Sequence, residues 1–180
     1  MKITKGQTAP DFAITDIYGK EIKLSSYKGK KIMLGFFRNV NCPFCNLRVH
    51  ELKKLREKFE EAGLQMIFVF ESKPELLKMS IFHTEVSLIP LIGDPSKVLY
   101  KQFGVEQSVV KLLSTFFTKG MMDDMKAGKA LNLPEDKEAT TTLIPADFLI
   151  DENFKIATAH YGGHLNDHIS IQDIKNFAGI

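Results

Sequence analysis

The two cysteines of this chain are the residues best suited to chemistry. Cys42 and Cys45 are separated by Pro43 and Phe44, and the sequence contains no other cysteine. The spacing predicts that both thiols share the first turn of a helix, close enough to form a disulfide. In such Cys-x-x-Cys pairs the first thiol has a pKa of roughly 3.5 to 7, against about 8.5 for a free cysteine. We therefore expect Cys42 to act as the nucleophile and Cys45 as the resolving thiol.

An apolar strand and an amphipathic helix flank the cysteine pair. Residues 32–37 are apolar throughout, which predicts a buried strand. Pro43 suits an early helical position, and apolar residues recur at helical spacing from residue 47 to residue 62. Cys42 should therefore lie at a helix N-terminus, where unpaired backbone N–H groups and the helix dipole stabilise a thiolate. This interpretation requires that solvent reach the Cys42 sulfur.

Polar side chains near the cysteines could modify this chemistry. Arg38 follows the strand, and a guanidinium within about 6 Å of Cys42 would lower the thiol pKa further, whereas a surface cation would not. We keep both alternatives for Arg38. Asn39 and Asn41 could offer side-chain amides in the same loop, and we expect Arg48 on the solvated face of the helix.

Composition indicates one globular domain over residues 1–180. The chain is 44% hydrophobic and 26% charged, which suffices for one substantial core. The formal net charge is +2 with both signs interspersed, so neither nucleic acid nor an anionic membrane is indicated as a partner. The first residues contain no long apolar run, and we expect no signal peptide and no spanning helix. A lone Cys-x-x-Cys pair suits a cycling catalyst in a reducing compartment, so we expect a cytoplasmic location.

The remaining elements predict an α/β fold with a central mixed β-sheet. In chain order we expect a hairpin over residues 12–24, strands at 32–37 and 65–70, an apolar run at 88–92, a helix at 96–103, strands at 147–151 and 155–161, and a last helix capped by Ser170. The strands on either side of the cysteine helix should pair in parallel. Ser72 and Glu75 match a capping box for a helix running toward His83. Helices should then cover both faces of the sheet.

Residues 105–133 form an expected helical insert rich in large apolar side chains. These are Val109, Val110, Leu112, Leu113, Phe116, Phe117, Met121, Met122 and Met125. They are more numerous than one packed helix face requires. We favour a lid folded over the domain core, with a homodimer or partner surface as the alternative. A non-catalytic interaction domain is a further alternative for the chain.

Six further segments carry short motifs outside the cysteine pair. They are residues 8–12 (Thr-Ala-Pro-Asp-Phe), 16–20, 24–30, 93–95 (Gly-Asp-Pro), 99–104 and 148–151 (Phe-Leu-Ile-Asp). Together these segments resemble the alkyl hydroperoxide reductase and thiol-specific antioxidant family, the peroxiredoxin side of the thioredoxin-like superfamily. Arg38, the cysteine pair and the late Asp167-His168 are most similar to the peroxiredoxin-like branch that carries Cys-x-x-Cys. The resemblance implies a thioredoxin-like fold and a thiol-dependent antioxidant oxidoreductase, which needs no metal or organic cofactor.

Three positions depart from the Pro-x-x-x-Thr-x-x-Cys signature and the strand arginine with which such peroxidases hold peroxide. Gly35 and Asn39 occupy the proline and threonine positions, and Pro145 occupies the position of the arginine. Pro145 instead resembles the cis-proline that thioredoxin-fold oxidoreductases place against their cysteines, where it exposes backbone groups to an extended peptide or thiol. An ordinary trans proline is the alternative. The substrate stays open between a peroxide and a protein disulfide, with a thioredoxin or glutathione system as the external reductant.

A metal-binding protein is the alternative function. Copper-delivery proteins of the thioredoxin-like group join a cysteine pair to a distant histidine, and His160, His164 and His168 are the candidates here. Gly162 and Gly163 interrupt a helical arrangement of these histidines. We therefore favour the thiol-dependent oxidoreductase, without a metal. Its candidate catalytic residues are Cys42, Cys45, Arg38 and Pro145.

Overall fold

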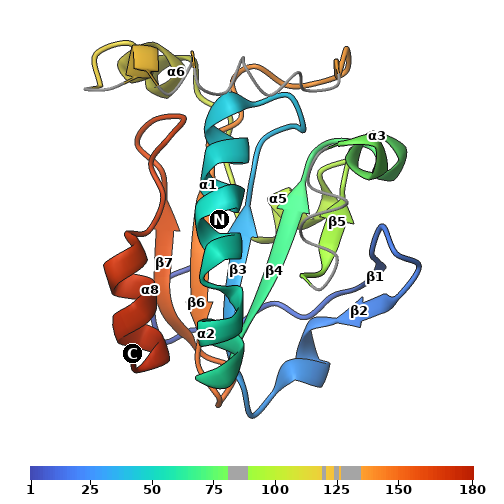
Figure 1. The fold of residues 1–180 in the computed structure, drawn as a ribbon, viewed down its shortest axis with the longest axis vertical. Coiled ribbons are helices and arrows are strands. Elements are labelled where there is room, and N and C mark those ends of the chain that lie inside the picture. Colours follow the sequence, from blue (N-terminus) through green and yellow to red (C-terminus); the bar gives the residue numbers. More distant parts are fainter. Residues whose placement is uncertain (81–88, 119–120, 124–125, 127–134) are drawn as a thin grey trace.

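The computed structural model describes residues 1–80, 89–118, 121–123, 126 and 135–180. Its centre is a five-stranded sheet in the order β5–β4–β3–β6–β7 (Figure 1). The strands are β3 (Lys31–Phe36), β4 (Leu64–Phe70), β5 (Leu91–Gly93), β6 (Ala146–Ile150) and β7 (Ile156–Tyr161). β3 pairs in parallel with β4 and antiparallel with β6. The predicted mixed sheet, and the parallel pairing across the cysteine helix, are therefore confirmed.

Two short strands form the expected N-terminal hairpin. β1 (Ala13–Thr15) pairs antiparallel with β2 (Glu21–Lys23) in a sheet of their own, and the short 3-10 helix η1 (Leu24–Tyr27) follows. Ile22 and Leu24 are buried in the same apolar cluster as Leu34 of β3. The hairpin thus packs against one face of the central sheet.

Helices cover both faces of the central sheet, as predicted. α1 (Pro43–Lys54), α2 (Arg56–Glu61) and α8 (Ile171–Ala178) lie on one face, and α5 (Val98–Gln102) lies on the other (Figure 1). Side chains of β3 alternate between these faces. Met33 packs in the cluster that contains Leu52 and Ile174, whereas Leu34 packs in the cluster that contains Tyr100. The helix expected to run from the cysteines to residue 62 is interrupted at Leu55, which separates α1 from α2.

One of the two predicted helix caps is correct. The Ser170 hydroxyl accepts a hydrogen bond from Asp173 N at 3.0 Å and caps α8. The Ser72 capping box is wrong, because α3 (Pro74–Met79) begins after Lys73 and has no side-chain cap. The Ser72 hydroxyl instead accepts from Val40 N at 2.9 Å and donates to Asp136. The predicted continuation toward His83, and Leu88 of the apolar run, lie outside the described residues.

The described part of the insert covers the core only in part, so the favoured lid stays a prediction. Helix α6 (Val109–Thr115) and the turn after it leave the side chains of Val110, Leu113, Phe116 and Phe117 between 55% and 91% exposed. Among the apolar side chains there, Met121 is buried and Leu112 packs partly against the core. Met125 lies outside the described residues. An interface role for this surface stays a prediction.

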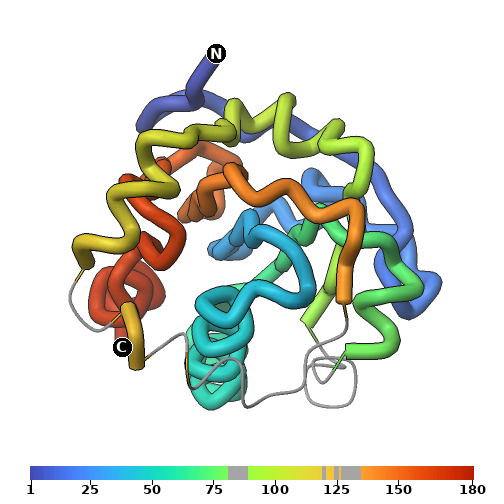
Figure 2. The backbone as a smooth tube through the Cα atoms, turned by 90° about the horizontal axis from the view of Figure 1, so that it is seen from above, coloured from blue at the N-terminus to red at the C-terminus, as the bar shows by residue number. Residues whose placement is uncertain are grey.

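The carboxyl ends of the two parallel central strands lie side by side. β3 leads into the loop of residues 37–42, and β4 leads directly into Glu71. Residues 135–145, which precede β6, run past this loop across the end of the sheet (Figure 2). We call this segment the strap. No helix among the described residues is long and apolar enough to cross a bilayer.

Candidate active site

The loop of residues 37–42 holds Cys42 at the first turn of α1. Cys42 is the N-cap residue and Pro43 occupies the first helical turn, as the sequence predicts. The Cys42 backbone N–H donates to Asn39 O at 3.2 Å. Asn46, buried in the next turn, donates through Nδ2 to the carbonyls of Val40 and Cys42 at 2.9 and 2.8 Å. The loop is therefore bound to its own helix, which fixes the direction of the Cys42 side chain.

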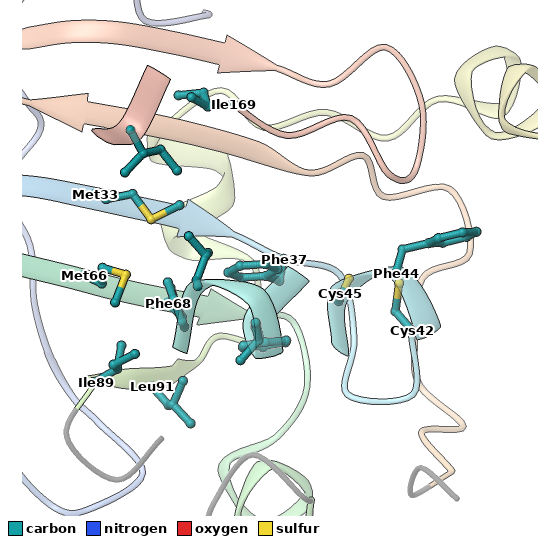
Figure 3. Packing of buried hydrophobic residues seen from close by; sticks show 14 of the residues in the cluster. Met33, Phe37, Cys42, Phe44, Cys45, Met66, Phe68, Ile89, Leu91 and Ile169 are labelled. Carbon is teal, nitrogen blue, oxygen red and sulfur yellow. The ribbon is translucent and has the colours of Figure 1, made fainter. Parts of the chain in front are cut away.

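Both thiols are free and lie at the start of α1 (Figure 3). Arg38 contacts each of them. Its Nη1 donates to Cys42 Sγ at 3.4 Å, and its backbone N–H donates to Cys45 Sγ at 3.4 Å. Its Nη2 donates to Thr141 O of the strap at 2.7 Å. Of the two alternatives for Arg38, the structure shows the first: the guanidinium is buried and contacts the Cys42 thiol.

The pKa values of the two thiols are shifted in opposite directions. Burial raises the pKa of Cys42, but hydrogen bonds from Cys45 and the charge and hydrogen bond of Arg38 outweigh burial and lower the pKa to about 6. For Cys45, burial and the neighbouring Cys42 sulfur raise the pKa well above its usual value. At neutral pH the pair is therefore one thiolate and one thiol.

The expectation that solvent reaches Cys42 is not met in this conformation. Cys42 is only 2% exposed and lies in the buried cluster that contains Phe44 and Met121. The structure therefore shows a closed site. Burial and a low pKa coexist here because the hydrogen bonds from Cys45 and the buried positive charge of Arg38 stabilise the thiolate.

Asn39 does not face the sulfur. Its Nδ2 donates to Glu71 Oε1 at 3.3 Å, so this amide does not replace the threonine hydroxyl of the peroxidase signature. The sequence analysis did not identify Glu71 as a site residue. It follows the apolar strand β4 directly, and the carboxyl ends of neighbouring parallel strands are where functional side chains gather. That position is the signal that could have identified it.

The prediction of a cis peptide bond at Pro145 is wrong. The Ile144–Pro145 bond is trans. The backbone groups around it are also occupied, since Ile144 N donates to Glu106 O at 3.1 Å and Pro145 O accepts from Gly162 N at 3.0 Å. These contacts hold the start of β6 against its neighbours and leave neither group free for an incoming peptide.

Arg48 is buried, contrary to the expectation of a solvated position. Its guanidinium donates to Glu51 at 2.9 Å and to Ile169 O. Its charge also contributes to the low pKa of Asp147, which burial opposes and the neighbouring His168 favours. The carbonyl of Ile169, 121 residues away in the chain, is a buried acceptor that helical spacing could not reveal.

Asp147 and His168 form a buried pair beside the sheet. His168 Nδ1 lies 3.0 Å from Asp147 Oδ2, and Ile169 N donates to the same oxygen at 2.9 Å. Asp147 faces Gly35 across the β3–β6 pairing. A Cβ at Gly35 would lie 2.9 Å from the Phe37 ring and 3.4 Å from Asp147 Oδ1. The glycine at this signature position thus makes room for the ring and the carboxylate.

The histidines do not support the metal-binding alternative. His160 Nε2 lies 3.0 Å from Asp167, His168 pairs with Asp147, and His164 accepts a hydrogen bond from Asn166 N. Within the described residues, no three side chains among His, Cys, Asp and Glu are grouped as a metal site would require.

Comparisons with known proteins agree with this geometry. A profile of the AhpC/TSA family matches residues 5–159. A Mycobacterium tuberculosis peroxiredoxin is 24% identical over 170 residues, which cover 94% of this chain and 92% of the relative. The chloroplastic peroxiredoxin Q of Sedum lineare is 30% identical over 105 residues, 58% of this chain and 55% of the relative.

The solved structures give the same fold. The PrxQ of Xylella fastidiosa, solved as a cysteine-to-serine mutant, superposes with a TM-score of 0.70 at 14% identity, covering 99% of this chain and 96% of the other. The central sheet and its helices are thus those of thioredoxin-like peroxiredoxins. With the family match over most of its length, the chain belongs to the AhpC/TSA family and is a peroxiredoxin-like, thiol-dependent oxidoreductase.

Proposed function

We propose that the chain is a thiol peroxidase in which Cys42 attacks a hydroperoxide and Cys45 resolves the product. One observation carries the assignment: Arg38 Nη1 lies 3.4 Å from Cys42 Sγ and favours its thiolate, while Cys45 stays protonated. A thiolate is the nucleophilic form of cysteine, and a protonated neighbour is held in reserve for the second step.

The reaction begins with the Cys42 thiolate and the outer oxygen of the hydroperoxide. An S–O bond forms, the O–O bond breaks, and the leaving oxygen takes up a proton to give water or an alcohol. Cys42 is then a sulfenic acid. Arg38 Nε is buried and has no hydrogen-bond partner among the described residues, so its N–H can donate to an oxygen that gains negative charge.

The second step joins the two sulfurs in a disulfide. Cys45 attacks the Cys42 sulfenic acid, an S–S bond forms, and the S–O bond breaks. The oxygen leaves as water with the proton of Cys45. An external dithiol, or two monothiols, then supplies two electrons and two protons to reduce the disulfide. We assign this reductant to a thioredoxin or glutathione system.

Because Cys42 is closed in the dithiol form, the hydroperoxide must enter after a local opening. The strap is held over the site by the contacts of Arg38 with Thr141 and of Ser72 with Asp136. Arg38, Ser72 and Asp136 are buried in these contacts. We take movement of the strap as the route to the sulfur. It would also break the hydrogen bond from Thr140 N to Glu71 and the surface pair of Glu138 with Lys73.

Peroxide consumption tests the assignment. Reduced protein is mixed with hydrogen peroxide and a thioredoxin regenerating system, and Cys42→Ser and Cys45→Ser are compared with the wild type. We expect Cys42→Ser to abolish turnover. Cys45→Ser should complete one turnover and accumulate a sulfenic acid that dimedone traps. Equal rates for Cys42→Ser and the wild type would refute the proposal.

A protein disulfide is the second candidate substrate, since both thiols of a Cys-x-x-Cys pair lie at the start of one helix. Insulin reduction by the same three proteins tests it. Rapid insulin reduction with no peroxide consumption would move the assignment to disulfide exchange.

A catalytic part for Pro145 stays a prediction, and Pro145→Ala in either assay tests it.

The setting of the protein is also part of the proposal. A cysteine pair that cycles between dithiol and disulfide suits a reducing compartment, which supports a cytoplasmic location. The exposed apolar side chains of α6 support a homodimer. Neither nucleic acid nor a membrane is proposed as a partner, because the net charge of +2 comes from interspersed charges of both signs.

A further inference from the structure

Glu71 is a buried carboxylate next to the Arg38 loop. It is 4% exposed, and its backbone N–H donates to Arg38 O at 3.0 Å. Its Oε1 accepts from Asn39 Nδ2 at 3.3 Å and from Thr140 N of the strap at 3.1 Å. Its Oε2 is buried and accepts no hydrogen bond from the described residues. The cysteine chemistry proposed above does not use this group.

Lys97 supplies a positive charge to that second oxygen. Its Nζ lies 3.4 Å from Glu71 Oε2, and its side chain is 22% exposed. Lys97 adopts a left-handed backbone conformation with φ of 58°, which is uncommon for a residue with a long side chain. The conformation is held by the turn before α5, in which Lys97 N donates to Asp94 O at 3.0 Å. The lysine is thus fixed at the start of a helix, beside the carboxylate.

Four charges alternate in sign from Lys97 to the nucleophile. They are the ammonium of Lys97, the carboxylate of Glu71, the guanidinium of Arg38 and the thiolate of Cys42. Burial lowers the pKa of Arg38, and the charges of Cys42, Cys45 and Glu71 raise it. When Cys42 enters a disulfide, its charge disappears. Glu71 then remains as a buried anion bound to the Arg38 loop and the strap, through its hydrogen bonds to Arg38 O, Asn39 Nδ2 and Thr140 N. An unpaired buried cation would be destabilising.

We propose that Glu71, held by Lys97, is a positioning residue that provides the counter-charge of Arg38 when Cys42 is oxidised. It thereby sets the balance between the thiolate and the disulfide. This inference rests on the redox cycle proposed above, and it adds a control of that cycle by two residues that do not touch the sulfurs. Removing the negative charge should leave the thiolate as the main anion for Arg38, which favours the reduced form.

The other ionisable groups around Glu71 either have other partners or are neutral. Asp94 accepts from Val98 N and Leu99 N and so caps α5. Burial and the charges of Glu71, Asp94 and Cys45 raise the pKa of Tyr100 well above its usual value, so it stays neutral. On the strap, Asp136 accepts from Ser72, and Glu138 pairs with Lys73 at the surface.

Two substitutions should shift the Cys42 pKa in opposite directions. Glu71→Gln removes the charge but keeps an amide oxygen for Asn39 and Thr140, and we expect the Cys42 pKa to fall by about half to one unit. Lys97→Gln leaves the Glu71 charge uncompensated, and we expect a rise of about the same size. The thiolate absorbance of the reduced protein, followed against pH, gives both values. The dithiol–disulfide ratio in glutathione buffers should move about three- to tenfold toward dithiol in Glu71→Gln.

The matched control is Glu138→Gln, which removes a surface carboxylate that also pairs with a lysine, Lys73. It should change neither quantity. An unchanged or raised Cys42 pKa in folded Glu71→Gln would overturn the inference. If that variant does not fold, Lys97→Gln decides, because its side chain is partly exposed, and an unchanged pKa there overturns the inference as well. These readouts need no peroxide turnover, so a failure of the peroxidase assignment remains distinguishable.

Discussion

Replacing Arg38 by glutamine should show how much of the Cys42 reactivity depends on one guanidinium. The substitution removes the donor 3.4 Å from Cys42 Sγ and the only charge among the described contacts of that sulfur. Burial then acts without opposition from a cation. From about 6, we expect the Cys42 pKa to rise by about two units, equivalent to about 2.7 kcal/mol.

The expected rate follows from the thiolate fraction. With a pKa of about 6, roughly nine-tenths of Cys42 is ionised at neutral pH, and with a pKa of about 8 the fraction is roughly one-tenth. Peroxide consumption by Arg38→Gln should therefore fall about tenfold near neutral pH through ionisation alone. Much of that loss should disappear about two pH units higher, where both proteins are ionised.

The assay combines a thiolate titration with peroxide consumption measured across the same pH range. Arg38→Lys keeps a charge but loses the fork that also reaches Thr141 O, and it should give an intermediate pKa. Arg56→Gln, which removes an arginine paired with Glu60 on α2, is the control and should match the wild type. A Cys42 pKa that stays near 6 in folded Arg38→Gln would refute the electrostatic reasoning.

Three further predictions concern stability and assembly. Because the folded pKa of Cys42 lies below its unfolded value of about 8.5, the thiolate stabilises the fold fully above about 8.5, and this contribution is lost as pH falls through about 6. The urea midpoint of reduced protein minus that of Cys42→Ser should thus grow with pH, and a constant difference would contradict this. Gly35→Ala should lower the free energy of unfolding by about 1–3 kcal/mol, since its Cβ would meet the Phe37 ring at 2.9 Å, and an unchanged midpoint would contradict it. If α6 forms a homodimer, Phe116→Glu should increase the elution volume of folded protein, and an unchanged volume would exclude that interface.

Local sequence patterns were sufficient for the position of the nucleophile. The apolar run before Cys42 and the proline after it define a strand, a loop and a helix start, and short-range rules govern all three. The parallel pairing of β3 and β4 followed from the same unit. These features depend on neighbours in the chain, which is why they were predictable.

The surroundings of the nucleophile depend on contacts between distant segments. Thr141 is 103 residues from Arg38 in the chain, and Glu71 is 32 residues from Asn39. No spacing rule relates such residues. Ser72 illustrates the difficulty. Its spacing from Glu75 matches a capping box, yet its hydroxyl donates to Asp136 on the strap instead.

The guanidinium of Arg38 divides its donors between Cys42 Sγ and the carbonyl of Thr141. Withdrawal of that carbonyl would vacate one N–H at the moment when the sulfur is uncovered. An arriving oxygen would then accept the hydrogen bond that Thr141 O has released. The strap movement that admits the oxidant would therefore also free the Arg38 N–H that binds it.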